Sequence, residues 1–201
     1  MHAASPQLPA LPPNETVFRL SVAQYHAMID AGVLTEDDPV ELLEGVLVQK
    51  MPKKPPHAIV VKLSTAAIEK LLPAGMHCRA QEPITLSESE PEPDLAIVRG
   101  QVRDYSTRHP SAAETLCVVE VSDTTLERDR TLKLRSYARA GIGQYWIINL
   151  VDRCVEVHTT PDAARGEPAY TARHVYHPGD ATPLLLPGQT NASIAVSELL
   201  P

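Results

Sequence analysis

The sequence lacks the features that mark secreted, membrane-spanning or zinc-stabilised proteins. Its three cysteines are far apart and form no CxxC pair, so neither a disulfide framework nor a structural zinc site is expected. No segment approaches the roughly 18 to 20 consecutive apolar residues that a membrane helix requires. The opening stretch, MHAASPQLPALPPNE, has neither the basic region nor the apolar run of a signal peptide. We therefore expect a cytoplasmic protein with no membrane attachment.

Positive charge is also scarce. Eighteen Lys and Arg residues face 25 Asp and Glu residues, for a formal net charge of -7. Non-specific DNA binding comes mainly from basic side chains that neutralise phosphates, so any activity on nucleic acid needs a local patch. Arg128, Arg135 and Arg139 form a basic stripe on one predicted helix and could contact phosphates, although such stripes are usually solvated.

What the sequence does contain is an alternation of helical and strand-like patterns. Helices are predicted over residues 57–72 and 124–140. The first rests on the helical spacing of Ile59, Leu63, Ala66, Ala67 and Leu71, and the second begins with a capping box from Thr124 to Glu127. Short apolar segments between and after them read as strands, among them LAIV, TLCVVEVS and YWIINL. The pattern predicts an α/β or α+β fold, with a central mixed β-sheet flanked by α-helices.

The length and composition set the domain organisation. Residues 1–16 are rich in proline and are predicted to be a flexible arm, while residues 17–201 are enough for a single domain with one core.

Two of the apolar strands carry an acid at one end. Asp94 begins LAIV, and Glu120 lies near the end of LCVVEVS. If these strands are antiparallel neighbours, the two ends meet, and two carboxylates about 4 Å apart repel by about 4 kcal/mol at an effective dielectric constant of about 20. A cation would remove that repulsion. Magnesium binds through one or two carboxylates together with waters and a substrate phosphate, which suits such a pair.

The second predicted helix adds a lysine. Asp129, Lys133 and Tyr137 recur every four residues, which places Lys133 near the sheet, where Asp129 could pair with it. A lysine there could orient a water, take its proton, or stabilise charge on a phosphate. Plainer interpretations exist: Glu120 and Lys133 could form a structural ion pair, Asp94 could serve a turn, and His57 could be a packing residue at a helix start.

The order of these motifs resembles a known family. PEPDLAIV followed by VVEVSDTTLERDRTLKLRSYARAGIGQYWIINL is similar to the Uma family of restriction-endonuclease-like proteins, within the PD-(D/E)XK nuclease superfamily. The similarity runs from about Tyr25 to the C-terminus and includes ELLEG at residues 41–45 and His57.

This resemblance implies a restriction-endonuclease-like fold and a metal-dependent endonuclease that hydrolyses DNA phosphodiester bonds. It implies that Asp94 and Glu120 bind Mg²⁺ or Mn²⁺, with the Val121 carbonyl as an extra ligand, and that Glu41 joins the acids, although Glu44 could be the inward-pointing residue instead. DNA is the expected partner, and a homodimer is left open.

The sequence departs from the superfamily pattern at one position. Ser122 stands where the superfamily has a catalytic lysine, so the resemblance makes Lys133 the substitute. Without that substitution, the alternative is a non-catalytic nuclease-fold protein that binds nucleic acid or a protein partner.

Overall fold

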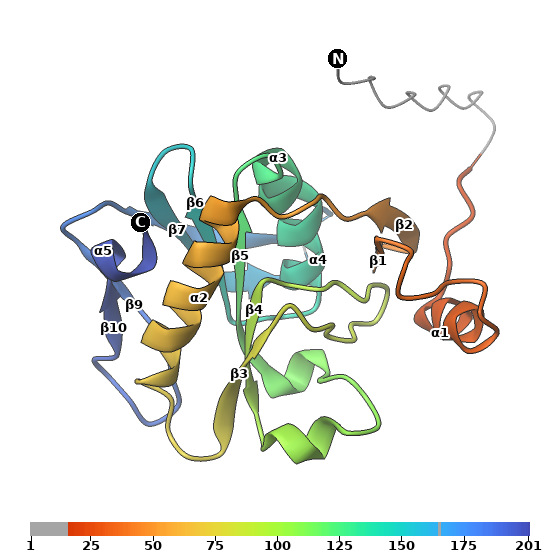
Figure 1. Ribbon diagram of the computed structural model, residues 1–201, viewed down its shortest axis with the longest axis horizontal. Coiled ribbons are helices and arrows are strands. Elements are labelled where there is room, and N and C mark those ends of the chain that lie inside the picture. Colours follow the sequence, from red (N-terminus) through yellow and green to blue (C-terminus); the bar gives the residue numbers. More distant parts are fainter. Residues whose placement is uncertain (1–15, 165) are drawn as a thin grey trace.

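The computed structural model describes residues 16–164 and 166–201 and is built on a six-stranded mixed sheet (Figure 1). The strands lie in the order β3-β4-β5-β6-β7-β8. Their bounds are Met76–Ala80, Leu95–Arg99, Thr115–Ser122, Gln144–Asn149, Cys154–Asp162 and Ala169–Tyr176. The arm predicted over residues 1–16 lies, except for Thr16, outside the described residues.

The pairing of β5 with β6 is parallel, whereas the other pairings in this sheet are antiparallel. Parallel neighbours need a crossover connection that returns the chain to the same end of the sheet. Three helical segments supply it: α3 (Leu126–Arg128), the π-helical η3 (Asp129–Lys133) and α4 (Leu134–Arg139). The crossover therefore begins at the C-terminal end of β5, where Glu120 lies two residues before the last residue of the strand.

The two faces of the sheet pack against different helices. In β5, Cys117, Val119 and Val121 join the core cluster that includes α2 (Pro55–Glu69) and α5 (Val196–Leu199), whereas Val118 joins the cluster that includes Tyr137 of α4. Side chains alternate between faces along a strand. Glu120, two residues after Val118, therefore faces the crossover rather than α2. Figure 1 shows α2 and α4 on either side of β5.

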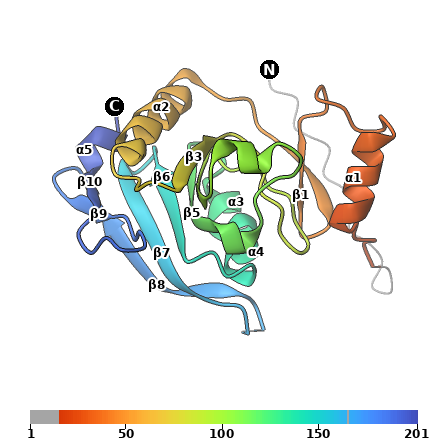
Figure 2. The same cartoon turned by 90° about the horizontal axis from the view of Figure 1, so that it is seen from below.

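A two-stranded hairpin lies beside the main sheet. It consists of β1 (Val40–Leu43) and β2 (Val46–Gln49) and follows α1 (Val22–Asp30). Glu44 and Gly45 both have positive φ, 47° and 76°, as a two-residue turn of this hand requires. Figure 2 shows this hairpin and α1 at the end of the molecule away from β7 and β8.

The remaining elements are short. They are the 3₁₀ turns η1 (Val102–Tyr105) and η2 (Ala112–Glu114) and the paired strands β9 (Ala181–Pro183) and β10 (Ser193–Ala195). No helix within residues 16–164 and 166–201 combines the length and apolarity needed to span a membrane.

Two local predictions were wrong. The α2 stripe was expected to include Ile59 and Leu63, but both are exposed. The helix buries Val60, Val61, Ser64, Ala67 and Ile68, of which Ala67 belonged to the expected stripe. The capping box from Thr124 to Glu127 does not form: Thr125 is the N-cap of α3 and gives no side-chain cap bond. Its hydroxyl is committed to a site carboxylate, described below.

Candidate metal and phosphodiester site

Asp94 and Glu120 lie at adjacent ends of antiparallel strands. β4 and β5 pair in the expected antiparallel direction, with Leu95 opposite Val119. Asp94, one residue before Leu95, therefore lies beside Glu120, one residue after Val119. The Val121 backbone N–H donates to Asp94 Oδ2 at 2.9 Å. The register of two neighbouring strands therefore brings together two acids that are 26 positions apart in the sequence.

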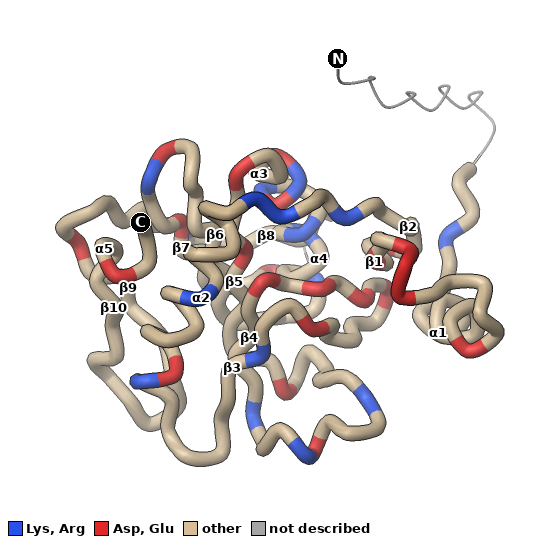
Figure 3. The backbone as a smooth tube through the Cα atoms, viewed as in Figure 1, with Lys and Arg blue, Asp and Glu red and all other residues tan. Residues whose placement is uncertain are grey.

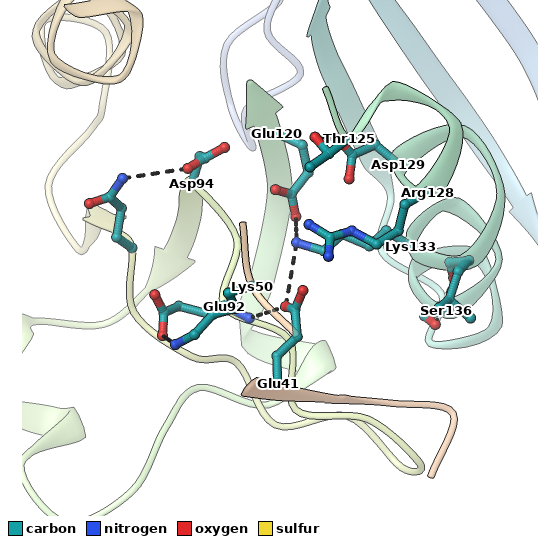
Figure 4. A network of polar contacts seen from close by, with 12 residues as sticks. Glu41, Lys50, Glu92, Asp94, Glu120, Thr125, Arg128, Asp129, Lys133 and Ser136 are labelled. Carbon is teal, nitrogen blue, oxygen red and sulfur yellow. Dashed lines mark hydrogen bonds and ion pairs between the residues drawn. The ribbon is translucent and has the colours of Figure 1, made fainter. Parts of the chain in front are cut away.

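Lys133 reaches this pair from the crossover. Its ammonium donates to Glu120 Oε1 at 2.9 Å and lies 3.4 Å from Glu41 Oε2, as Figure 4 shows. Lys133, Glu120 and Glu41 are only 3%, 3% and 2% exposed. The Tyr137 hydroxyl donates to the same Glu120 oxygen at 2.7 Å. Hydrogen-bonded partners offset part of the cost of burying these charges.

Glu41, rather than Glu44, belongs to this cluster. The Glu92 backbone N–H donates to Glu41 Oε2 at 3.1 Å, which fixes its carboxylate toward Lys133. Glu44 instead accepts two hydrogen bonds from Arg135, at 2.7 and 2.6 Å, on the other side of the hairpin. The alternation of side chains along β1 and its turn separates the two acids.

His57, which the sequence suggested to be a helix-start or packing residue, is a neighbour of Asp94. Its Nε2 lies 3.0 Å from Asp94 Oδ2. Burial alone would raise the pKa of Asp94, but the hydrogen bond and charge of His57 and the Val121 amide hold that pKa below its ordinary value. Asp94 is therefore ionised at neutral pH. The sequence showed only a histidine at the start of a predicted helix. No spacing rule connects that histidine to Asp94.

Glu120 and Lys133 have shifted protonation equilibria. Burial raises the pKa of Glu120 to about 8, against the lowering effect of Lys133 and with added repulsion from Asp129, Asp94 and Glu41. Burial would lower the pKa of Lys133, but the surrounding acids raise it above its ordinary value. We conclude that Lys133 stays protonated, and that Glu120 holds its proton more tightly than an exposed glutamate.

Asp129 does not pair with Lys133 in the predicted way. Its Oδ2 accepts hydrogen bonds from Ser122 Oγ at 2.7 Å and Thr125 Oγ1 at 2.6 Å, while its Oδ1 is buried without a hydrogen-bond partner. The prediction assumed regular α-helical spacing. The π-helical turn over Asp129–Lys133 alters that spacing and directs Asp129 toward the strand end.

Side-chain hydroxyls support this π-helical turn. Tyr145 donates to the Asp129 carbonyl at 3.0 Å, and Ser136 donates to the Leu132 carbonyl at 2.8 Å. The Asp129 carbonyl also accepts the backbone N–H of Leu134, five residues on, which is the bond that defines a π-helical turn. π-Helical turns are rare and occur often at functional sites.

The acids line a narrow cleft. Its lining includes Asp94, Glu120 and Lys133, and its water-accessible volume of about 70 Å³ has room for an ion with its waters. Across the described residues, no three His, Cys, Asp or Glu side chains are gathered so as to hold a metal ion by themselves. Two carboxylates and a backbone carbonyl nevertheless fit Mg²⁺ or Mn²⁺, because such ions keep several waters. A site that relied on side chains alone for coordination would not fit.

Comparison with known proteins agrees with this geometry. No curated protein matches the chain. Among solved structures, a crystal structure from Anabaena variabilis ATCC 29413, described as a "putative nuclease belonging to DUF820", superposes with a TM-score of 0.63 at 14% identity, covering 84% of this chain and 94% of that one. At this identity the likeness establishes the nuclease fold alone.

A family model settles the relationship. The model for Uma2, described as "Putative restriction endonuclease", matches residues 22–197. That range contains every residue of the cleft, from Glu41 to Lys133, and confirms the resemblance found from the PEPD and EVS motifs. The chain belongs to the Uma2 family.

Proposed function

We propose that this protein is a metal-dependent endonuclease that hydrolyses phosphodiester bonds in DNA. The observation that carries the proposal is the convergence of Asp94, Glu120 and the Lys133 ammonium in one cleft, on three different elements. A purely structural ion pair needs one acid. Here the lysine lies between Glu120 and Glu41, and Asp94 lies beside them.

Asp94, Glu120 and the Val121 carbonyl would hold the Mg²⁺ or Mn²⁺ ion. Such an ion, when bound, supplies Lewis-acid polarisation of a phosphate oxygen and lowers the pKa of a water. His57 and the Val121 amide fix the Asp94 carboxylate and keep it ionised. Because the pKa of Glu120 is about 8, Glu120 would have to release a proton when the ion binds at neutral pH.

The raised pKa of Lys133 bears on its role. An ammonium that stays protonated cannot accept a proton from an attacking water. Lys133 is therefore assigned to stabilising the negative charge that develops on the phosphate, or to orienting the water by donating a hydrogen bond. Tyr137 holds Glu120 in place, and Glu41 is a second partner of the ammonium, so the position of Lys133 is restricted from two sides.

A second candidate is a nuclease-fold protein that binds nucleic acid or a protein without cleaving it. Ser122 favours it, because this residue occupies the position of the superfamily's lysine and is committed to Asp129. The commitment of Glu120 Oε1 to both Lys133 and Tyr137 favours it as well.

A cleavage assay separates the two candidates. Supercoiled plasmid incubated with Mg²⁺ or Mn²⁺ should be nicked or linearised by the wild type, and not after chelation or in Glu120→Gln. In parallel, calorimetry with Mn²⁺ should detect binding by the wild type that is strongly weakened in Glu120→Ala. Metal binding without cleavage would favour the non-catalytic candidate, and equal Mn²⁺ affinity in wild type and Glu120→Ala would exclude Glu120 as a ligand.

The proposal extends to the compartment. Cys78, Cys117 and Cys154 form no disulfide, which suits a reducing environment. We place the activity in the cytoplasm, where DNA is accessible.

A further inference from the structure

The mouth of the cleft is basic on two opposite sides, although the protein as a whole is acidic. Lys50, Lys53 and Lys54 come from the segment that joins β2 to α2, and Arg128 comes from α3. Figure 3 shows the blue stretch between β2 and α2 close to the α3 turn. The Arg128 Nη1 donates to the Gln49 carbonyl at 3.0 Å, which ties the two sides together.

Two of these four cations already have acidic partners. Lys50 pairs with Glu92 at 2.8 Å, and Lys54 pairs with Asp123 at 3.0 Å. In the part of the chain that the structure describes, neither Lys53 nor Arg128 has an acidic group within ion-pair distance. Lys53 and Arg128 are thus the cations of the mouth whose charge is not neutralised by the protein.

Arg128 differs in this respect from the other arginines of the predicted basic stripe. Arg135 pairs with Glu44 at 2.6 Å, and Arg139 pairs with Glu88 at 2.6 Å, so neither is available at the cleft. Arg128 has a buried Nε with no hydrogen-bond partner. The residue as a whole is only partly buried, so its positive charge can still attract an anion at the mouth.

The position of Arg128 indicates which anion would fit. Arg128 lines the same cleft as Lys133, and both side chains start from the crossover (Figure 4). A phosphate at the cleft would be attracted by both cations. The guanidinium presents several N–H donors in a plane that matches phosphate oxygens. Lys53, a compact charge on a flexible stem at the opposite side, suits a second phosphate.

We propose that Arg128 and Lys53 form a phosphate clamp that holds one DNA strand across the mouth of the cleft. Arg128 contacts the phosphate above the acids, and Lys53 contacts a neighbouring phosphate of the same strand. In this arrangement the strand lies over the cleft and presents its backbone to the acids and to Lys133, all of which line the cleft. The clamp rests on the proposed function, because it positions the same bond for hydrolysis.

The test is the salt dependence of DNA binding. Fluorescence anisotropy with a labelled DNA duplex, in Ca²⁺ in place of Mg²⁺, gives the slope of log affinity against log salt concentration. Each lost phosphate contact lowers that slope by about 0.9 for duplex DNA. Arg128→Ala and Lys53→Ala should each reduce the slope by about that amount, and the double variant by about twice as much. Arg128→Lys should retain the slope, since it keeps the charge.

The controls separate the clamp from the fold and from the proposed function. Lys70→Ala, at the exposed C-terminal end of α2, should bind DNA with the wild-type slope, and Mn²⁺ affinity should be unchanged in Lys53→Ala. Lys53 makes no hydrogen bond in the described structure, so its removal tests the clamp even if Arg128→Ala folds poorly. A wild type that cuts plasmid while Lys53→Ala keeps the full slope would overturn the clamp alone. A wild type that neither binds nor cuts DNA would overturn both proposals.

Discussion

At the scale of single residues, one buried ammonium balances several acids. Lys133 lies within 3.4 Å of both Glu41 and Glu120, and the Asp129 charge acts on it as well. When a buried charge loses its partner, the protein loses more stability than the intact pair contributed. The stability of the cluster therefore depends on this lysine, whether or not the protein cleaves DNA.

Replacing Lys133 with methionine should separate its two roles. Lys133→Met keeps most of the length of the side chain but leaves Glu41 and Glu120 without their cation, so the free energy of unfolding should fall by about 3–5 kcal/mol at pH 8. The difference in the free energy of unfolding between the variant and the wild type should be smaller at pH 5, where the acids can take up protons. Cleavage should fall by about 10²–10³-fold if the ammonium stabilises the transition state. Denaturant titrations and plasmid assays measure both, with Lys70→Met as the exposed control.

Glu120 should make stability depend on pH. Because its pKa is raised to about 8, the folded protein keeps a proton that the unfolded chain releases near pH 4.5. The stabilisation is fully present below about pH 4.5 and is lost as the pH rises through 8, at up to about 1.4 kcal/mol per pH unit. Asp94, with its lowered pKa, changes protonation only below this window.

The matched variant for this prediction is Glu120→Gln, which cannot titrate. The charged or titratable groups around Glu120 are Lys133, Asp129, Asp94, Glu41 and Tyr137. In the wild type, the free energy of unfolding measured with urea should fall between pH 5 and pH 8. In Glu120→Gln, most of that fall should be absent. If both proteins show the same slope, another group is responsible for it.

The residues of the site were predictable to different degrees. Asp94 and Glu120 stood out because an acid at the end of an apolar strand is unusual, and Lys133 followed from helical spacing. The contact of His57 with Asp94 could not be predicted, because it depends on how α2 packs over β4. The hydrogen bonds of Asp129 could not be predicted either, because nothing in local spacing reveals a π-helical turn.

At the scale of elements, the hairpin β1–β2 positions Glu41. The turn at Gly45 lies against the segment before α1: a Cβ at Gly45 would come 2.6 Å from Arg19 Cβ and 2.9 Å from the Leu20 carbonyl oxygen. The adjacent Glu44 backbone N–H donates to Ser89 Oγ at 2.8 Å, and the Gly45 N–H donates to the Glu88 carbonyl at 2.9 Å. Close packing on one side and hydrogen bonds on the other fix the hairpin and its carboxylate.

Gly45→Ala should therefore disturb Glu41 at a distance. Gly75→Ala is the matched control, because Gly75 also has positive φ, 81°, but a methyl group on its Cα would meet no atom within 4 Å. Both variants should lose about 1 kcal/mol or more to backbone strain. Only Gly45→Ala should also reduce cleavage and speed amide exchange at Leu42. Equal effects in both would show that the hairpin does not control the site.

The sequence pattern predicted most elements, and its errors have physical causes. The alternation in TLCVVEVS and the apolar run YWIINL predicted β5 and β6, since buried strands have strong patterns. The buried face of α2 was misassigned by about one residue position, because alanine, valine and leucine surround the whole helix and many stripes fit. The parallel pairing of β5 with β6 depends on the crossover, which no local pattern encodes.

At the scale of the whole molecule, the cleft joins four distant stretches of chain. Glu41 comes from the hairpin, Asp94 and Glu120 come from the central sheet, and Lys133 comes from the crossover. A ligand that binds only this arrangement binds only the folded protein, and so stabilises it.

Manganese should therefore raise the melting temperature. At about 100 times its dissociation constant, a single bound ion adds about 2.7 kcal/mol, which for a chain of this size corresponds to roughly 5–10 °C. Asp94→Asn should show little of this increase, because it loses the carboxylate that the Val121 amide and His57 hold in place. Differential scanning fluorimetry with and without Mn²⁺ measures the shift. A full shift in Asp94→Asn would mean that the ion binds elsewhere.

The crossover between β5 and β6 also sets the order in which the site is completed during synthesis. Domains form from the N-terminus as the ribosome releases the chain, so Glu41, Asp94 and Glu120 emerge before Lys133, and the crossover cannot dock until its parallel partner β6 has followed. A chain that stops before Gln144 would carry the acids without the strand that holds the crossover over them. Under the proposed function, an interrupted translation product would therefore be harmless to the genome of the cell that makes it.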